Sequence, residues 1–195
     1  MSAASAIPSL NAKIRIRIAD EDDIPAIQEI YAHYVLNSTS SFEEDAPTVA
    51  EMTARWQKLQ SRKMPFLVAV VGKRVSGYAY GGPYRERSAY RYTVEDSIYI
   101  SPEMMGRGIG NALMSELIKR CTNLGYRQMI AVIGDSTNAA SLAIHSRHGF
   151  RVIGALSSSG FKFGRWADAV LMQRSLGDGD STLPPGQAGK RKRKR

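Results

Sequence analysis

The stretch that decides the fold is YRYTVEDSIYISPEMMGRGIGN, residues 90–111. Apolar and polar residues alternate over 94–100, which is typical of a strand, and Pro102 ends that pattern. A helical pattern with one apolar face then begins, directly after three closely spaced glycines: Gly106, Gly108 and Gly110. Because glycine has no side chain, a ligand can approach the backbone N–H groups at this helix start closely. Such a turn is typical of a phosphate-binding site.

Two familiar phosphate motifs do not fit this loop. A nucleotide P-loop requires Lys-Ser or Lys-Thr after its last glycine, and a dinucleotide fingerprint requires G-x-G-x-x-G within a parallel strand-helix-strand unit. The spacing G-R-G-I-G-N, with Glu95 eleven residues before Gly106, instead resembles the coenzyme A pyrophosphate loop of the GNAT superfamily of N-acetyltransferases, usually Q/R-x-x-G-x-G/A. Met105 stands where that family usually has Gln or Arg, which removes one side-chain contact and leaves the backbone donors.

Two further blocks extend this resemblance along the chain. MIAVIGDSTNAASLAIHSRHGF (129–150) is similar to the family's N-x-x-S-x-x-x-(Tyr/His)-x-x-x-G-F segment. GFKFGRWADAVLMQ (160–173) and the Thr-Val-Glu run at 93–95 resemble the phosphinothricin and methionine sulfoximine acetyltransferases. The resemblance covers about residues 14–176 and identifies the chain as a member of that subfamily.

The order of the expected elements agrees with an α/β (α+β) GNAT fold, in which helices flank a central sheet that mixes antiparallel and parallel strands. We expect a strand at 14–18, a helix capped by Asp20 or Asp22, a second helix opened by the capping box Thr48-x-x-Glu51, and a hairpin of strands 66–71 and 75–80. The glycine-loop strand and helix, a strand from 129, a helix from Asn138 and two C-terminal strands follow.

Composition sets the broad class of the protein. The 195 residues suit one domain, and 43% hydrophobic with 23% charged residues describes a globular chain. No apolar run has transmembrane length, so no membrane-spanning segment is expected. The N-terminal segment lacks the features of a secretory signal, and Cys121, the single cysteine, excludes an intramolecular disulfide and suits a reducing compartment. We therefore expect a cytoplasmic protein.

The positive charge is concentrated at one end of the chain. Residues 190–195 are Lys-Arg-Lys-Arg-Lys-Arg, and without these six cations the net charge of +9 falls to +3. We expect a flexible arm at 1–13, a GNAT domain at 14–176 and a disordered basic tail at 177–195. The tail has three functional interpretations: a nuclear address, a weak nonspecific nucleic-acid contact, or a membrane patch. The alternative is a solvated tail that aids solubility.

The resemblance assigns catalytic roles to two residues. Glu95 falls at the subfamily's general base, which accepts the proton of the substrate ammonium directly or through a water. His145 falls where many GNAT enzymes have a tyrosine near the coenzyme A sulfur, and it could protonate the leaving thiolate or order a water chain. Considered without the family, Glu95 is a strand carboxylate in a surface ion pair and His145 an ordinary helix histidine.

The resemblance also implies the ligand contacts of acetyl-CoA. The strand backbone would pair with the pantetheine arm, the glycine loop would hold the pyrophosphate, and an N-cap asparagine would add a contact. Arg107 could reach a phosphate or face solvent. The residues implied for the cofactor are Ile98, Tyr99, Ile100, Gly106, Arg107, Gly108, Ile109, Gly110, Asn111 and Asn138. No His/Cys spacing typical of a metal site occurs, so no metal is expected.

An amino-acid-like acceptor requires a cation for its carboxylate and walls for its side chain. The candidates are Phe42, Tyr84, Arg85, Arg91 and Tyr92, together with the base Glu95. The loop 81–89 lacks the tryptophan that the methionine sulfoximine type has near Pro83, and it is closer to the phosphinothricin type.

Two classes of function follow. The first is an acetyl-CoA-dependent N-acetyltransferase that acts on the α-amine of a small compound such as phosphinothricin or methionine sulfoximine, as a homodimer, with resistance to such herbicides or antibiotics as a consequence. A polyamine, an aminoglycoside or a protein N-terminus is an alternative acceptor. The second class is a non-catalytic, nucleic-acid-associated module that uses the basic tail.

Overall fold

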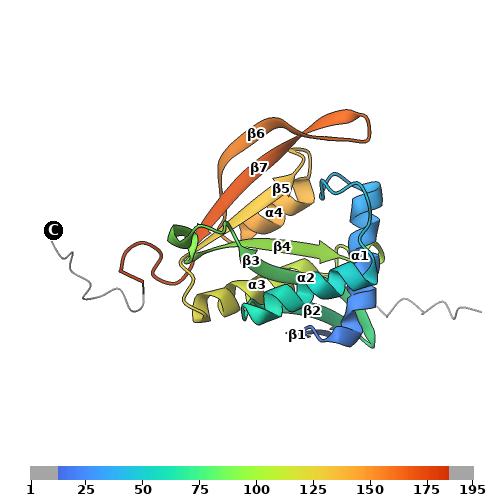
Figure 1. The fold of residues 1–195 in the computed structure, drawn as a ribbon, viewed down its shortest axis with the longest axis horizontal. Coiled ribbons are helices and arrows are strands. Elements are labelled where there is room, and N and C mark those ends of the chain that lie inside the picture. The colour runs from blue at the N-terminus through green and yellow to red at the C-terminus, as the bar shows by residue number, and fades with distance from the viewer. Residues whose placement is uncertain (1–12, 185–195) are drawn as a thin grey trace, which may run out of the picture.

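The structure is a computed structural model that describes residues 13–184. Most of the predicted N-terminal arm and the basic run at 190–195 lie outside the described residues. A seven-stranded sheet with the order β1-β2-β3-β4-β5-β7-β6 forms the centre of the molecule (Figure 1). All neighbouring strands pair antiparallel except β4 and β5, which are parallel. The predicted mixed sheet is therefore confirmed.

The elements have the following bounds. The strands are β1 (Ile14–Ile18), β2 (Phe66–Val71), β3 (Arg74–Pro83), β4 (Thr93–Ile100), β5 (Gln128–Gly134), β6 (Arg151–Lys162) and β7 (Arg165–Ser175). The α-helices are α1 (Ile24–Asn37), α2 (Val49–Ser61), α3 (Ile109–Asn123) and α4 (Ala139–Arg147). Short 3-10 turns occur at η1 (Glu21–Asp23), η2 (Ser88–Tyr90) and η3 (Pro102–Met104).

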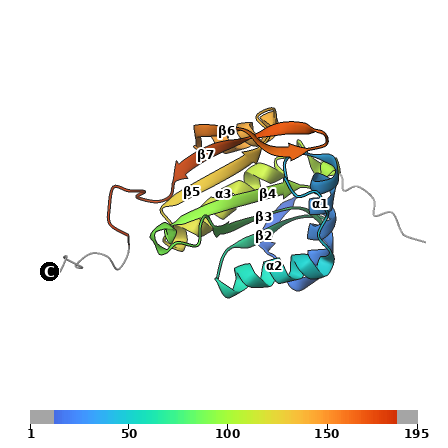
Figure 2. The same ribbon diagram turned by 45° about the horizontal axis from the view of Figure 1, so that its top comes forward.

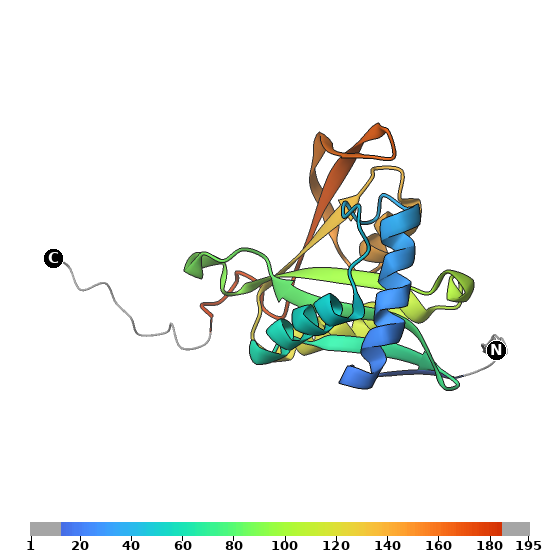
Figure 3. The same ribbon diagram turned by 45° about the vertical axis from the view of Figure 1, so that its right-hand side comes forward.

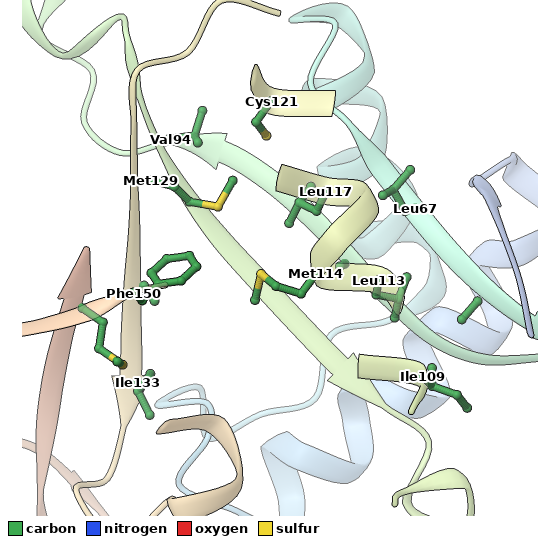
Figure 4. Packing of buried hydrophobic residues seen from close by; sticks show 14 of the residues in the cluster. Leu67, Val94, Ile109, Leu113, Met114, Leu117, Cys121, Met129, Ile133 and Phe150 are labelled. Carbon is green, nitrogen blue, oxygen red and sulfur yellow. The ribbon is translucent and has the colours of Figure 1, made fainter. Parts of the chain in front are cut away.

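The sheet is covered on both faces. On one face of the sheet lie α1 and α2 (Figure 2). They pack against a cluster that includes Phe66 and Tyr78, whose stacked ring centroids are 5.8 Å apart. On the other face α3 buries Leu113, Met114 and Leu117 completely against the central strands (Figure 4). The apolar face predicted for the helix after the glycine loop is thus the one that faces the core.

The helix starts follow the expected capping chemistry. The Thr48 side chain accepts a hydrogen bond from the Glu51 backbone N–H, and the Glu51 carboxylate accepts one from the Thr48 N–H, so the predicted capping box is confirmed. Asp20 caps the 3-10 turn η1, and α1 itself begins one turn later, at Ile24, with Pro25 in its first turn.

The parallel pair at the centre of the sheet is short. β4 and β5 are paired only over Thr93–Glu95 and Gln128–Ile130. Beyond these residues β5 keeps its pairing with β7 as far as Gly134, whereas β4 continues beside β3. The two strands therefore separate and leave a wedge-shaped opening between the distal halves of β4 and β5.

The described chain continues past residue 176, where the sequence places the end of the domain. Residues 177–182 form turns and bends, and the Arg127 guanidinium donates to the Gly179 carbonyl at 3.4 Å and to the Leu183 carbonyl at 3.1 Å. The first part of the predicted tail is consequently attached to the domain. No helix among residues 13–184 is long and apolar enough to cross a membrane.

Candidate active site

A cleft of about 790 Å³ occupies the opening between β4 and β5. One wall is β4 from Glu95 to Ile100, and the opposite wall is β5 from Ala131 to Gly134. The glycine loop closes one end, and residues of α4 and of the connection after α1 complete the walls. The strand divergence thus produces a long cleft with a carboxylate where the strands part and a helix N-terminus at the other end.

The glycines of the loop have two different functions. Gly106 (φ +76°) and Gly108 (φ +80°) have left-handed backbone angles, and a Cβ added to either would face open space. Gly108 is also the N-cap of α3. A Cβ on Gly110 would instead lie 2.6 Å from Ile144 Cδ1. Gly106 and Gly108 therefore leave an open cradle beside the backbone at the start of α3, while Gly110 permits the close packing of α3 against α4.

The structure brings most of the residues expected at the cofactor together. Nine of the ten line the cleft: Ile98, Tyr99, Ile100, Gly106, Gly108, Ile109, Gly110, Asn111 and Asn138. Arg107 does not line it. Asn138 caps α4 by accepting from the Ser141 N–H at 3.1 Å, and its Nδ2 donates to Ser40 Oγ at 3.1 Å. The Asn138 side chain is therefore already bound to protein groups at both ends.

The open cradle at the start of α3 and the splayed strand edge suit acetyl-CoA. Backbone N–H groups at a helix N-terminus match a pyrophosphate, and the separation of β4 from β5 leaves room for an extended arm along β4. One backbone acceptor on this edge is already used, because the Tyr34 hydroxyl donates to the Ile100 carbonyl at 2.6 Å. Tyr34 itself also lines the cleft.

Glu95 lies at the point where β4 and β5 part. It is paired with Ile130 at the last position of the parallel ladder and lines the cleft. Burial raises the pKa of its carboxyl above the ordinary value, the neighbouring Asp96 raises it further, and Arg85 opposes both effects. A carboxylate with a raised pKa is a stronger base, which is the property required for removing a proton from an ammonium group.

His145 forms a buried pair with Asp96, a residue that the motif analysis missed. Its Nε2 lies 3.0 Å from Asp96 Oδ2, and its Nδ1 lies 2.7 Å from the Ser141 carbonyl oxygen. Burial opposes the charged imidazolium, but the hydrogen bond and the charge of Asp96 outweigh burial, so the pKa of His145 is raised. Since both ring nitrogens face acceptors, the arrangement favours an imidazolium that holds α4 against β4.

A sequence signal for Asp96 was present. It occupies the apolar phase of β4, between Val94 and Ile98, and an acidic residue at a core position requires a partner. Burial raises the pKa of the Cys121 thiol on α3 to about 12, and the charge of Asp96 adds to this effect. Asp96 Oδ1 is buried and has no hydrogen-bond partner among residues 13–184.

The structure separates the acceptor candidates into two groups. Phe42 lines the cleft, whereas Tyr84, Arg85, Arg91 and Tyr92 do not. Two cation–π pairs, Arg85 over Tyr84 at 5.1 Å and Arg91 over Tyr92 at 4.8 Å, lie in and beside the loop before β4. Of the two arginines, only Arg85 acts electrostatically on Glu95. Among residues 13–184 no group of three or more His, Cys, Asp or Glu side chains is arranged to hold a metal ion.

Known proteins are similar to this chain in sequence and in fold. The chain is 52% identical over 169 residues to a phosphinothricin N-acetyltransferase of Alcaligenes faecalis, covering 87% of this chain and 86% of the relative. It is 38% identical over 161 residues to the L-methionine sulfoximine/L-methionine sulfone acetyltransferase of Salmonella typhimurium, covering 83% and 94%.

A solved structure agrees. The crystal structure of a GNAT superfamily phosphinothricin acetyltransferase from Sinorhizobium meliloti in complex with AcCoA superposes with a TM-score of 0.87 at 46% identity, covering 89% of this chain and 94% of that one. Residues 16–171 match the Acetyltransferase (GNAT) domain. The resemblance inferred from the motifs is confirmed, and the chain belongs to the GNAT acetyltransferase family.

Proposed function

We propose that this enzyme transfers an acetyl group from acetyl-CoA to the α-amine of a small amino-acid-like acceptor of the phosphinothricin or methionine sulfoximine type. The observation that carries the proposal is the position of Glu95, a carboxylate of raised pKa at the apex of a cleft whose far end is an open helix N-terminus. Bound acetyl-CoA supplies an activated acetyl thioester. Relatives named for these two acceptors support the choice of substrate class.

The chain's own residues supply binding and proton transfer. Gly106 and Gly108 expose backbone donors for the pyrophosphate, and Glu95 accepts the proton that an ammonium must lose before it can attack a carbonyl. His145, held by Asp96 and the Ser141 carbonyl, keeps α4 in place against the cleft. In this proposal His145 orients the site, in contrast to the thiolate donor that the resemblance suggests.

The charge near Glu95 supports an acceptor that has a carboxylate. Arg85 is an exposed cation close enough to Glu95 to lower the pKa of its carboxyl. A cation at this position attracts the carboxylate of an amino acid and repels a polyamine or an aminoglycoside. Arg91 also lies over a tyrosine ring, that of Tyr92, but it donates to the Ser88 carbonyl and does not act on the pKa of Glu95.

A panel of amines tests this proposal by the release of coenzyme A. We expect phosphinothricin, methionine sulfoximine and related amino acids to be acetylated, and polyamines not. Glu95→Gln should reduce turnover roughly 10²–10⁴-fold while acetyl-CoA affinity is retained. Arg85→Gln should raise the KM for the acceptor, whereas the matched variant Arg91→Gln should not. Preferential acetylation of polyamines, or undiminished turnover in Glu95→Gln, would contradict the assignment.

We also propose that the protein is a homodimer that associates through the β6–β7 hairpin. This hairpin carries large apolar side chains that are more than half exposed: Val152, Ile153, Leu156, Phe161, Phe163 and Trp166. Exposed apolar patches of this kind mark interaction surfaces. Sedimentation should give a dimer for the full chain and a monomer for Phe161→Glu. Leu36→Glu, at an equally exposed apolar residue on α1, is the control and should remain dimeric.

A cytoplasmic location is part of the same proposal. Cys121 is the single cysteine, and it is free and fully buried, which suits a reducing compartment.

A further inference from the structure

The connection after α1 forms one wall of the cleft. Its residues 38–43 are here called the wall loop, and Ser40, Ser41, Phe42 and Glu43 from this loop line the cleft. The loop leaves the end of α1 and runs beside the end of β5 and the β6–β7 hairpin (Figure 3). Its position therefore depends on contacts with segments that are more than 90 residues away in the sequence.

Lys162, at the end of β6, holds the wall loop directly. Its side chain is only 3% exposed, and its Nζ donates to the Ser38 carbonyl at 2.8 Å and to the Ser41 carbonyl at 2.7 Å. These two bonds span the loop just before Phe42. Within residues 13–184 no carboxylate lies within ion-pair distance of Lys162.

A buried ammonium without a carboxylate requires a physical reason. Burial lowers the pKa of Lys162, and the charges of Glu44 and Glu43 offset this effect only in part, so the environment disfavours the charge of Lys162. A methionine or leucine would fill such a position without that cost. The two carbonyl bonds are the reason for a lysine here, because only a long side chain with several N–H donors can reach both oxygens at once.

A second attachment comes from the neighbouring strand. Arg165 is the cross-strand partner of Lys162, and it forms an ion pair with the buried carboxylate of Asp135. Asp135 in turn accepts a hydrogen bond from Thr39 Oγ1 at 2.9 Å. Both polar residues at the hairpin tip therefore hold the same loop, Lys162 directly and Arg165 through Asp135.

Two glycines let the loop lie directly on the sheet. A Cβ on Gly134 would lie 2.2 Å from the Thr39 carbonyl oxygen, and a Cβ on Gly160 would lie 2.5 Å from the Phe42 ring. Any side chain at either position would push the loop away. The Phe42 ring thus has a defined seat on the Gly160 backbone, on the wall of the cleft.

We propose that Lys162 is a positioning residue for the acceptor side of the site. Its two carbonyl bonds fix the wall loop and thereby the position of the Phe42 ring, which limits the shape of the acceptor that the cleft can bind. Lys162 does not line the cleft and acts through the loop. This inference rests on the proposed function for its kinetic consequence, although the attachment of the loop can be measured independently of any substrate.

The first experiment measures the loop itself. Hydrogen exchange of peptides that cover residues 38–43 is compared between the full-length wild-type chain, Lys162→Met and the control Lys119→Met, a substitution at an exposed lysine on α3. Exchange in the wall loop should accelerate in Lys162→Met only. Unchanged exchange in a folded Lys162→Met protein would overturn the proposal, and this arm remains decisive even if the proposed acceptor is wrong.

The second experiment measures the consequence for the reaction. Lys162→Met removes both carbonyl bonds and should raise the acceptor KM about tenfold, because part of the free energy of these charged hydrogen bonds no longer holds the wall loop. The KM for acetyl-CoA should stay unchanged. The same substitution in a Phe42→Ala background should have little further effect, because the ring that Lys162 positions is already absent. Equal increases in both KM values, or full additivity with Phe42→Ala, would refute the role of Lys162 as a positioning residue.

A further variant keeps the proposal testable if Lys162→Met does not fold. Gly160→Ala retains Lys162 but displaces the Phe42 ring from its seat. It should raise the acceptor KM in the same way and leave acetyl-CoA binding unchanged. An acceptor KM that stays at the wild-type value in this variant would show that the seat of Phe42 does not control the acceptor.

Discussion

Asp96 Oδ2 and His145 Nε2 lie 3.0 Å apart, and the two side chains are 1% and 3% exposed. The pair joins β4 to α4 across the opening where β4 and β5 separate. The backbones of β4 and β5 are not paired beyond Glu95 and Ile130. The contact of Asp96 with His145 therefore connects β4 to the helix that follows β5. The imidazole is also bonded to the Ser141 carbonyl, which orients the ring.

Asp96→Asn should destabilise the fold and lower the pKa of His145. Removing one partner of a buried pair costs about 3–5 kcal/mol in the free energy of unfolding, because the other charge remains uncompensated. Urea denaturation measures this loss, and Asp22→Asn, at an exposed acid in η1, is the control. An NMR titration that finds the pKa of His145 unchanged in Asp96→Asn would show that the pair does not set it.

The pair also makes stability depend on pH. The folded-state pKa of His145 is raised, so its contribution is complete below the unfolded-state value of about 6.5 and is lost as pH rises through the folded-state pKa. The wild-type protein should therefore lose stability across this window, and Asp96→Asn should show a flatter curve. Thermal unfolding at a series of pH values measures the difference.

The pH dependence of turnover should report Glu95 and its neighbour Arg85. The base must be ionised, so kcat/KM should fall on the acid side through a pKa above that of an ordinary glutamate. Arg85 lowers this pKa, and Arg85→Gln should consequently move the acid limb to higher pH with the same acceptor. A limb that stays in place would indicate that another group controls it.

Glu95→Gln should not destabilise the protein at neutral pH, although it removes activity. A carboxyl whose folded-state pKa is raised favours the folded state when protonated, and its stabilising effect is lost as pH rises above the unfolded-state pKa. Ionised Glu95 therefore lowers the free energy of unfolding at neutral pH, and the neutral amide of glutamine does not. A clear fall in melting temperature would assign Glu95 a structural role instead.

Gly108→Ala should weaken acetyl-CoA binding about tenfold or more, because the methyl group displaces an anion from donors whose bonds to charged groups are worth roughly 1.5–3 kcal/mol. Gly72→Ala is the matched control, since Gly72 also has a positive φ and open space around it, but lies in the β2–β3 turn. Both variants should lose similar stability, about 1–2 kcal/mol from the left-handed backbone. Calorimetry that finds equal affinity in both would place the pyrophosphate elsewhere.

Deleting residues 185–195 should leave acetyl transfer and melting temperature unchanged, because the contacts of Arg127 with Gly179 and Leu183 are retained. The deletion removes the six adjacent cations, so any retention on DNA or RNA at low ionic strength should disappear. Loss of transfer in this variant would connect the basic run to the site. Tight, salt-resistant nucleic-acid binding by a full-length chain without acetyl transfer would favour the binding module.

Local sequence patterns were sufficient to predict those features that depend only on interactions between residues close together in the chain. The alternation over 94–100, the apolar face of α3 and the Thr48–Glu51 capping box each depend on neighbours within one or two turns, and the structure has all three. The glycine loop was recognisable for the same reason, since its spacing specifies a backbone path. The different surroundings of Gly108 and Gly110 could not be predicted from the sequence, because Ile144, which packs against Gly110, comes from another helix.

By itself, then, the sequence determined the family, the mixed sheet, and the strand and loop that carry Glu95 and the glycines. Only the tertiary structure decided the partners of these residues. It paired His145 with Asp96, kept Arg91 from acting on Glu95 while Arg85 acts on it, and fixed the wall loop to Lys162. The contacts of His145 with Asp96 and of Lys162 with Ser38 join residues 49 and 124 positions apart. The energies of all these contacts depend on burial, which a linear pattern does not record.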